Sequence, residues 1–167
     1  TKCAYFNEDF VSLLNKKFDV INASGIFFHL EELHSVTRGI KKALKDDGVF
    51  VVQFIYLKKM IENYAFDQIY HEHLLYYNLR SLEYLLNLHG LDIFDSEEVS
   101  IHGGSCIAYV SHKGSRKKTD RYKGMIQEED LKNLHLSETY ISYSKELLEM
   151  KHKNLSFLES CRKKNKT

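Results

Sequence analysis

The alternation of apolar and polar residues early in the chain predicts a strand, a helix and a second strand. The runs 18–23 and 49–55 are rich in β-branched residues, and each predicts a buried strand. The second is apolar almost throughout, as in a strand buried on both faces of a sheet. The segment 30–44 between them carries apolar residues at helical spacing, namely Leu33, Val36, Ile40 and Leu44. The triplet 46–48, Asp-Asp-Gly, predicts a turn. These about 38 residues predict a βαβ unit and an α/β fold class.

The pattern after residue 78 predicts a helix, two strands and a helical end. Residues 79–88 predict an amphipathic helix, and 91–94 with 106–110 predict a hairpin or an antiparallel edge pair. The polar segment 113–123 predicts a loop or linker. From 127 to 161 the pattern is helical, with one apolar face made by Tyr140, Leu147, Leu148, Leu155 and Leu158. We interpret this face as ordinary helix packing.

The composition of the chain argues against nucleic acid and membranes as binding partners. The chain has 43% hydrophobic and 28% charged residues, as in globular soluble proteins, and its net charge of +1 offers no general attraction to nucleic acid. No apolar run approaches the ~20 residues that span a bilayer, and no signal peptide is recognisable. We therefore predict neither a nucleic-acid partner nor a membrane partner.

The cysteines indicate neither a disulfide framework nor a metal site. Cys3, Cys106 and Cys161 are odd in number and far apart, and they form no Cys-x-x-Cys pair. A structural zinc site held by cysteines is therefore not expected, and a reducing cytoplasm is the predicted location.

The segment 66–74 concentrates groups that can move protons between apolar neighbours. These groups are Tyr70, His71, Glu72 and His73. Desolvating them costs free energy unless each finds a partner, so a cleft that handles protons explains the cluster economically. Two alternatives stay open. One is a hydrogen-bonded structural cluster beneath a loop, and the other is a metal site built on His71 and His73.

Five motifs occur in a fixed order along the chain. They are Asp19-Val20-Ile21, Phe28-His29-Leu30, the segments 44–49 and 66–77, and His102-Gly103-Gly104-Ser105. In this order they resemble the S-adenosylmethionine-dependent C-methyltransferases that act on nucleotide-activated deoxysugars. The resemblance extends from about Tyr5 to Val110, and the strings IYHEH and HGGS, about thirty residues apart, are specific as a pair. The chain departs from the family pattern at Gln53, Ile55 and Ile107.

The resemblance implies an organisation for the chain. Residues 1–112 would form the second half of a Rossmann-like methyltransferase domain, and residues 113–167 a linker and the start of a helical C-terminal substrate domain. The family's N-terminal zinc-binding lobe and its acidic glycine-rich cofactor loop have no counterpart in this sequence. We therefore expect a fragment that is inactive by itself, with zinc confined to that lobe. The expected cofactor is S-adenosyl-L-methionine, and the expected partner is a nucleotide-sugar substrate.

The resemblance also implies roles for single residues. His73 would be the base that removes the proton next to the sugar ketone, and Tyr70 would donate a hydrogen bond to the ketone oxygen as it becomes an enolate. Glu72 would orient a histidine or bind a sugar hydroxyl, and His71 is a further catalytic candidate. The cofactor would lie beside Asn22, Ala23 and His29. Substrate contacts are expected from Tyr76, Tyr77, His102, Gly103, Gly104 and Ser105.

Structural roles are the alternatives for several of these residues. His29 could instead pack against Phe27 and Phe28. The HGGS segment could be a plain turn between two strands, and Tyr76 and Tyr77 could be core residues. At the level of function, the alternative is a non-catalytic domain that only binds a nucleotide sugar.

The backbone conformation of the motif distinguishes two arrangements. In an extended segment, Tyr70 and Glu72 would face one way and the two histidines the other. In a turn, Tyr70 and His73 would share a face. The expected chemistry needs the phenol beside the base, so it predicts a turn.

Overall fold

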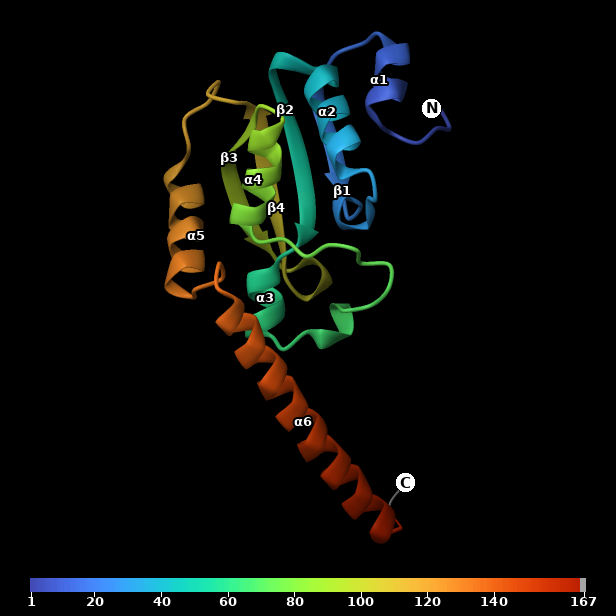
Figure 1. Cartoon of the computed structure of the whole chain (residues 1–167), viewed down its shortest axis with the longest axis vertical. Helices are drawn as coiled ribbons and strands as arrows, with labels where there is room; N and C mark the ends of the chain where they lie inside the picture. The colour runs from blue at the N-terminus through green and yellow to red at the C-terminus, as the bar shows by residue number, and fades with distance from the viewer. Residues whose placement is uncertain (166–167) are drawn as a thin grey trace.

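The computed structural model describes residues 1–165, and a four-stranded sheet forms its centre (Figure 1). The strands are β1 (Phe18–Ser24), β2 (Leu44–Ile55), β3 (Leu91–Val99) and β4 (Ser105–His112), in the order β1-β2-β4-β3. β1 and β2 are parallel and are joined by the helix α2 (Leu33–Ala43), whereas β4 is antiparallel to both of its neighbours. The predicted βαβ unit, the antiparallel pair and the α/β fold class are confirmed.

Five further helices complete the part of the chain that the structure describes. They are α1 (Glu8–Leu14), α3 (Leu57–Glu62), α4 (Leu79–Leu88), α5 (Asp120–Leu131) and α6 (Ser137–Lys163), with 3-10 turns at Phe27–His29, Phe66–Gln68 and Ile101–Gly103. The bounds of α4 agree with the prediction. Its N-terminus is fixed by a capping box, in which Asn78 accepts from the Ser81 N–H and the Ser81 hydroxyl oxygen accepts from the Asn78 N–H.

The core lies between the sheet and the helices α2 and α4, which Figure 1 shows on the same side of the sheet. Most of its fully buried side chains come from β2, β3, β4, α2 and α4, and include Phe50, Val52, Phe54, Ile93, Ala108, Val110, Ile40, Leu82 and Leu86. Burying each such side chain contributes about 1.5–3 kcal/mol. The carboxyl ends of β1 and β2 are thereby held at one edge of the sheet, where the candidate site lies.

Two details of the first strands differ from the prediction. The triplet 46–48 is not a turn but the irregular start of β2, because pairing moves from Phe18 with Leu44 to Val20 with Val49. β1 is not a buried strand, since it forms an edge of the sheet with only one face covered. Val20 is exposed on the open face, although the sequence made it look like part of a core.

The predicted helix 127–161 is interrupted, and the predicted loop 113–123 is too long. α5 begins at Asp120, where the Thr119 hydroxyl accepts from the Tyr122 N–H as an N-cap. The break between α5 and α6 contains Asn133 in a left-handed conformation (φ 52°), which ends the helical path. The buried side chain of Leu134 holds this break against the body of the protein.

The helix α6 projects away from the sheet (Figure 1). Tyr143 is its buried residue, whereas Leu148, Leu155 and Leu158 are exposed. The prediction of ordinary packing is therefore wrong for the second half of the apolar face. The last two residues of the predicted region 113–167 lie outside the described part. No helix within residues 1–165 combines the length and apolar character needed to cross a membrane.

Candidate active site

The motif segment folds into a tight turn beyond the carboxyl ends of β1 and β2. The His73 N–H donates to the Tyr70 carbonyl over 3.1 Å, which closes the turn. The two side chains then lie on one side of it, with ring centroids 4.1 Å apart. The predicted turn, and with it the juxtaposition of phenol and imidazole, is confirmed.

His73 is held with one ring nitrogen engaged. Its side chain is buried, at 8% exposure, and meets Phe28 edge-on with ring centroids 4.7 Å apart. Its Nδ1 lies 2.8 Å from the Gln68 carbonyl oxygen. Because a carbonyl only accepts, Nδ1 must carry the hydrogen, so Nε2 is the unprotonated nitrogen of the neutral ring. This arrangement prepares Nε2 to take a proton.

His29 joins this pair from the segment that follows β1. Its ring centroid lies 5.1 Å from that of His73, and its Nδ1 lies 2.6 Å from the Glu72 carbonyl oxygen. The N–H groups of Leu74 and Leu75 both donate to the Phe28 carbonyl. The motif turn is therefore fixed to the end of β1, which brings the expected cofactor contact beside the expected base.

The side chains of His71 and Glu72 are exposed beside this cluster, and the His71 ring lies edge-on to the Tyr70 ring with centroids 6.3 Å apart. The His71 side chain is 90% exposed, and its Nε2 lies 4.0 Å from a Glu72 carboxylate oxygen. Within residues 1–165 no group of three His, Cys, Asp or Glu side chains is placed to hold a metal ion. The metal alternative thus has no ligand set there, since His71 and His73 occupy different environments.

The two tyrosines after the motif differ sharply. Tyr76 is half-buried, and its hydroxyl donates to the Gln68 carbonyl over 3.2 Å, so this carbonyl serves both Tyr76 and His73. Tyr77 is 5% exposed, and its ring contacts Phe27 and Phe54. Burial raises the pKa of the Tyr77 phenol, and its hydroxyl has no hydrogen-bond partner within residues 1–165. Tyr77 belongs to the core, which argues against the predicted substrate contact.

The HGGS segment divides into an exposed and a packed half. His102 (φ 52°) and Gly103 (φ 77°) are exposed, and nothing lies within 4 Å of where a Gly103 Cβ would be. A Cβ on Gly104 would lie only 2.5 Å from the Lys59 Cβ, so this glycine is needed for packing against α3. Ser105 is fully buried. Of the four residues of this segment that were predicted to contact substrate, only His102 and Gly103 are accessible to a ligand.

Gln53 is a buried polar residue of the site region to which the sequence analysis gave no role. Its amide nitrogen donates to the Ser105 hydroxyl over 2.9 Å, and its amide oxygen accepts from the Ser24 hydroxyl over 3.2 Å. This chain of contacts links the ends of β1 and β2 to the start of β4. A glutamine inside an otherwise apolar strand was the signal that could have identified it.

The two other expected cofactor contacts lie on β1 itself. Asn22 is exposed on the open face of this edge strand, beside the exposed Ser24 two residues further on. Ala23 points to the opposite face and packs against the core. The structure of residues 1–165 therefore places His29 beside the His73 ring, whereas Asn22 and Ala23 make no contact of this kind.

An apolar groove of about 760 Å³ runs between the motif segment and α6. Its lining includes Leu57, Met60, Ile69, Tyr76, Tyr143 and Leu147. Neither Tyr70 nor His73 lines this groove, so it is separate from the candidate base.

The chain belongs to the methyltransferase domain family. The family described as "Methyltransferase domain" matches residues 4–96, which is more than half of the chain. Residues 100–167 match a second family, described as "C-methyltransferase C-terminal domain".

One curated relative is the C-methyltransferase NovU of Streptomyces niveus. It is 38% identical over 85 residues, which is 51% of this chain and 20% of NovU. The match thus spans about one fifth of the relative's length.

Similar solved structures include the mitomycin 7-O-methyltransferase MmcR, with a TM-score of 0.47 and 15% identity over 62% of this chain and 32% of that chain. Another is the magnesium protoporphyrin IX methyltransferase ChlM from Synechocystis PCC 6803 with bound SAH. Its TM-score is 0.46 and its identity 13%, over 62% of this chain and 48% of that chain.

Proposed function

We propose that this chain carries the base and the enolate-binding part of an S-adenosylmethionine-dependent C-methyltransferase whose substrate is a nucleotide-activated keto-deoxysugar. The observation that carries the proposal is the pairing of Tyr70 with a buried His73 whose Nδ1 is occupied by a carbonyl. The match to the C-methyltransferase C-terminal domain family supports transfer to carbon.

The two side chains suit the removal of a proton next to a ketone. His73 Nε2 would take the proton from the carbon beside the carbonyl, and the C–H bonding pair would move into the developing enolate. The Tyr70 hydroxyl would donate a hydrogen bond to the ketone oxygen as its negative charge grows. S-adenosylmethionine, when bound, supplies the electrophilic methyl group that the enolate carbon receives.

The residues at the end of β1 fit a polar cofactor in part. Asn22 and Ser24 present exposed polar side chains, and His29 adds an imidazole beside the candidate base. In parallel sheets, ligands bind at the carboxyl ends of the strands, where these groups lie. Of the expected cofactor contacts, Asn22 and His29 remain in the proposal, because Ala23 packs against the core. The nucleotide sugar would contact Tyr76, His102 and Gly103.

The test compares two histidines of the same motif in the complete reading frame that contains this chain. His73→Ala should lower kcat by about 10²–10⁴-fold and abolish exchange of the substrate proton in D2O, because the base is gone. His71→Ala should change the rate by less than about threefold, because its exposed side chain is not placed to act as the base. Exposed His135 provides a matched control, His135→Ala, outside the motif.

Proton exchange gives a decisive readout because it does not need the methyl transfer step. Loss of exchange in His73→Ala alone supports the assignment. An unchanged methyl-transfer rate in His73→Ala would refute the catalytic role. Binding of a nucleotide sugar without any proton exchange in the unmodified protein would favour the non-catalytic binding domain.

A further inference from the structure

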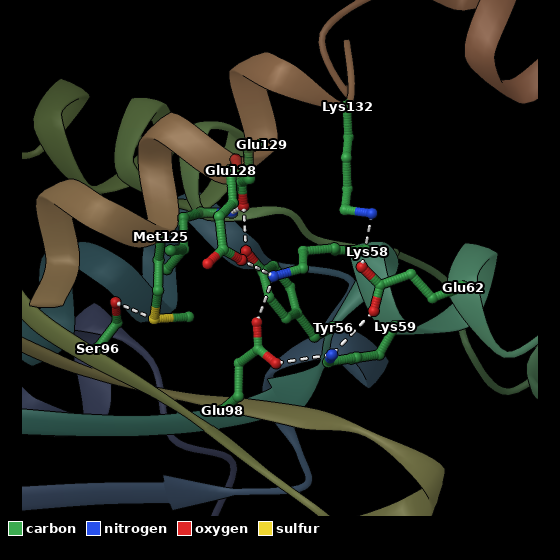
Figure 2. A network of polar contacts seen from close by, with 11 residues as sticks. Tyr56, Lys58, Lys59, Glu62, Ser96, Glu98, Met125, Glu128, Glu129 and Lys132 are labelled. Atoms are coloured by element: carbon green, nitrogen blue, oxygen red, sulfur yellow. Dashed lines mark hydrogen bonds and ion pairs between the residues drawn. The ribbon is translucent and has the colours of Figure 1, made fainter.

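Glu129 is a fully buried carboxylate on α5, at 0% exposure. Its Oε1 accepts from the Tyr56 hydroxyl over 2.8 Å and from the Leu79 N–H over 2.6 Å. Its Oε2 lies 3.3 Å from the Arg80 N–H. Figure 2 shows the carboxylate reaching the Tyr56 hydroxyl from the α5 side. A carboxylate this deeply buried needs such donors, since an unpaired buried charge is very costly.

The donors come from the two ends of one segment. Tyr56 immediately follows β2, and Leu79 is the first residue of α4. Between them, residues 57–78 carry α3 and the motif turn with Tyr70 and His73. The ends are also joined directly, because the Leu57 N–H donates to the Tyr77 carbonyl over 2.9 Å. One side chain from α5 thus holds both ends of the segment that carries the candidate base.

Neighbouring contacts strengthen the same attachment. Lys58, a buried residue of α3, pairs with Glu98 of β3 and with Glu128 of α5 (Figure 2). The Arg80 guanidinium pairs with Asp130 of α5. The carboxylates in these pairs, Glu98, Glu128 and Asp130, are all more exposed than Glu129, so solvent partly screens the pairs. Glu129 is the buried centre of the attachment, and its burial raises the pKa of its carboxyl although the N–H and hydroxyl donors counter this.

We propose that Glu129 is a positioning residue for the candidate site: by fixing Tyr56 and the N-terminus of α4 together, it determines where the segment 57–78 places Tyr70 and His73. The catalytic consequence rests on the proposed function, whereas the positioning itself does not. Glu129 lies in the part of the chain that matches the C-methyltransferase C-terminal domain family. Tyr70 and His73 lie in the part that matches the methyltransferase domain family. The second region would therefore shape the site of the first.

The first experiment needs no activity and uses the 167-residue chain. Hydrogen exchange of amides in 57–78 and nitrogen NMR of the His73 ring are measured in Glu129→Gln, Tyr56→Phe and Asp120→Asn. Glu129→Gln keeps the shape of the side chain but replaces one carboxylate oxygen by an amide N–H2, which cannot accept from the backbone N–H groups of Leu79 and Arg80. Tyr56→Phe removes only the hydroxyl that donates to Glu129. Asp120→Asn makes the same carboxylate-to-amide change on α5, at an exposed residue that pairs only with Lys123 within that helix.

Exchange in 57–78 should become roughly tenfold faster in Glu129→Gln, and less so in Tyr56→Phe, because buried hydrogen bonds at the base of the segment are lost. The His73 ring should lose its single tautomer as the Gln68 contact loosens. Asp120→Asn should change neither. If Glu129→Gln only lowers Tm, while exchange in 57–78 and the His73 tautomer match those of Asp120→Asn, the proposal is overturned.

The second experiment uses the complete reading frame. Glu129→Gln should lower kcat roughly tenfold with KM for the nucleotide sugar nearly unchanged, because the base is displaced while exposed substrate contacts remain. An unchanged kcat together with faster exchange in 57–78 would overturn the catalytic consequence. If the unmodified frame transfers no methyl group, the proposed function fails, and the exchange and NMR results still decide the positioning role by themselves.

Discussion

The rings of Tyr70 and His73 lie 4.1 Å apart, centroid to centroid, on one side of a turn closed by the backbone of the same two residues. His73 is buried and bonded through Nδ1, whereas the Tyr70 ring is partly exposed beside it. The pair therefore combines an oriented proton acceptor with a hydroxyl donor that a ligand can reach. Both properties depend on the turn, because an extended backbone would send the two side chains to opposite faces.

Tyr70→Phe tests the donor without disturbing the turn. The phenyl ring keeps its packing against His73. Among the residues that the structure describes, none hydrogen-bonds to the Tyr70 hydroxyl, so Tm should change by less than about 2 °C. In the complete reading frame, kcat should fall by about 10²–10³-fold, because a donor to the developing oxyanion is lost. Steady-state kinetics and a thermal melt check both parts. A fall in Tm with an unchanged kcat would contradict the assignment.

Tyr77→Phe and Tyr56→Phe make the same chemical change with opposite expected results. The buried Tyr77 hydroxyl has no hydrogen-bond partner in the described part of the chain, so removing it should leave the free energy of unfolding unchanged or raise it by up to about 1 kcal/mol. The Tyr56 hydroxyl donates to buried Glu129, so removing it should cost about 1–3 kcal/mol. Urea unfolding of the two variants in parallel measures the contrast, and equal losses would show that the Tyr77 hydroxyl is satisfied.

Gly103→Ala and Gly104→Ala separate backbone strain from packing in the HGGS segment. Both positions have positive φ, which an alanine adopts at a cost of about 1 kcal/mol or more. Only Gly104 also lacks space, because its Cβ would meet Lys59 of α3. In urea unfolding, we expect the free energy of unfolding to fall by about 1 kcal/mol in Gly103→Ala and by more than about 2 kcal/mol in Gly104→Ala. The reverse ranking would mean that α3 yields to the added methyl group.

Asp95→Asn should lower stability at neutral pH. Burial alone would raise the pKa of Asp95, but hydrogen bonds from Arg121, Thr119 and the Ser96 N–H outweigh it and lower the pKa. A depressed pKa stabilises the fold above the unfolded value of about 3.9 and loses this effect as the pH falls through the folded value. At pH 7, we expect the variant to lose about 1–2 kcal/mol.

The pH dependence provides the check on Asp95. The difference in unfolding free energy between Asp95→Asn and the unmodified chain should shrink as the pH is lowered from about 4, because the carboxyl then becomes neutral in both states. Asp46→Asn is the matched control, since its side chain is 98% exposed and its pair with Lys17 is solvent-screened. A pH-independent difference for Asp95→Asn would show that its charge is not the cause.

Local patterns predicted much of the secondary structure correctly. The helix 79–88 was predicted with its bounds because an amphipathic repeat depends on residues close together in the chain. The strand around 49–55 and its parallel pairing with the first strand followed in the same way from an apolar run joined through a helix. The turn at Tyr70–His73 followed from the demands of the expected chemistry.

Other features had no local signal strong enough to predict them. The exposure of Val20 depends on β1 being an edge strand, and the break before α6 depends on a left-handed Asn133. The core position of Tyr77 depends on the rings of Phe27 and Phe54, which come from two other segments. For Val20 and Tyr77, the presence or absence of long-range neighbours decided between exposure and burial for a residue type that suits both.

The sequence by itself determined the α/β class, the order of most elements and the cluster of proton-handling groups at Tyr70–His73, because apolar periodicity and residue chemistry are local properties. Only the tertiary structure decided that His29 meets His73, that Gln53 meets Ser105, and that Glu129 of α5 reaches Tyr56 and Leu79. These partners are far apart in the chain, and they meet because the strand order β1-β2-β4-β3 gathers strand ends and helix starts at one edge of the sheet.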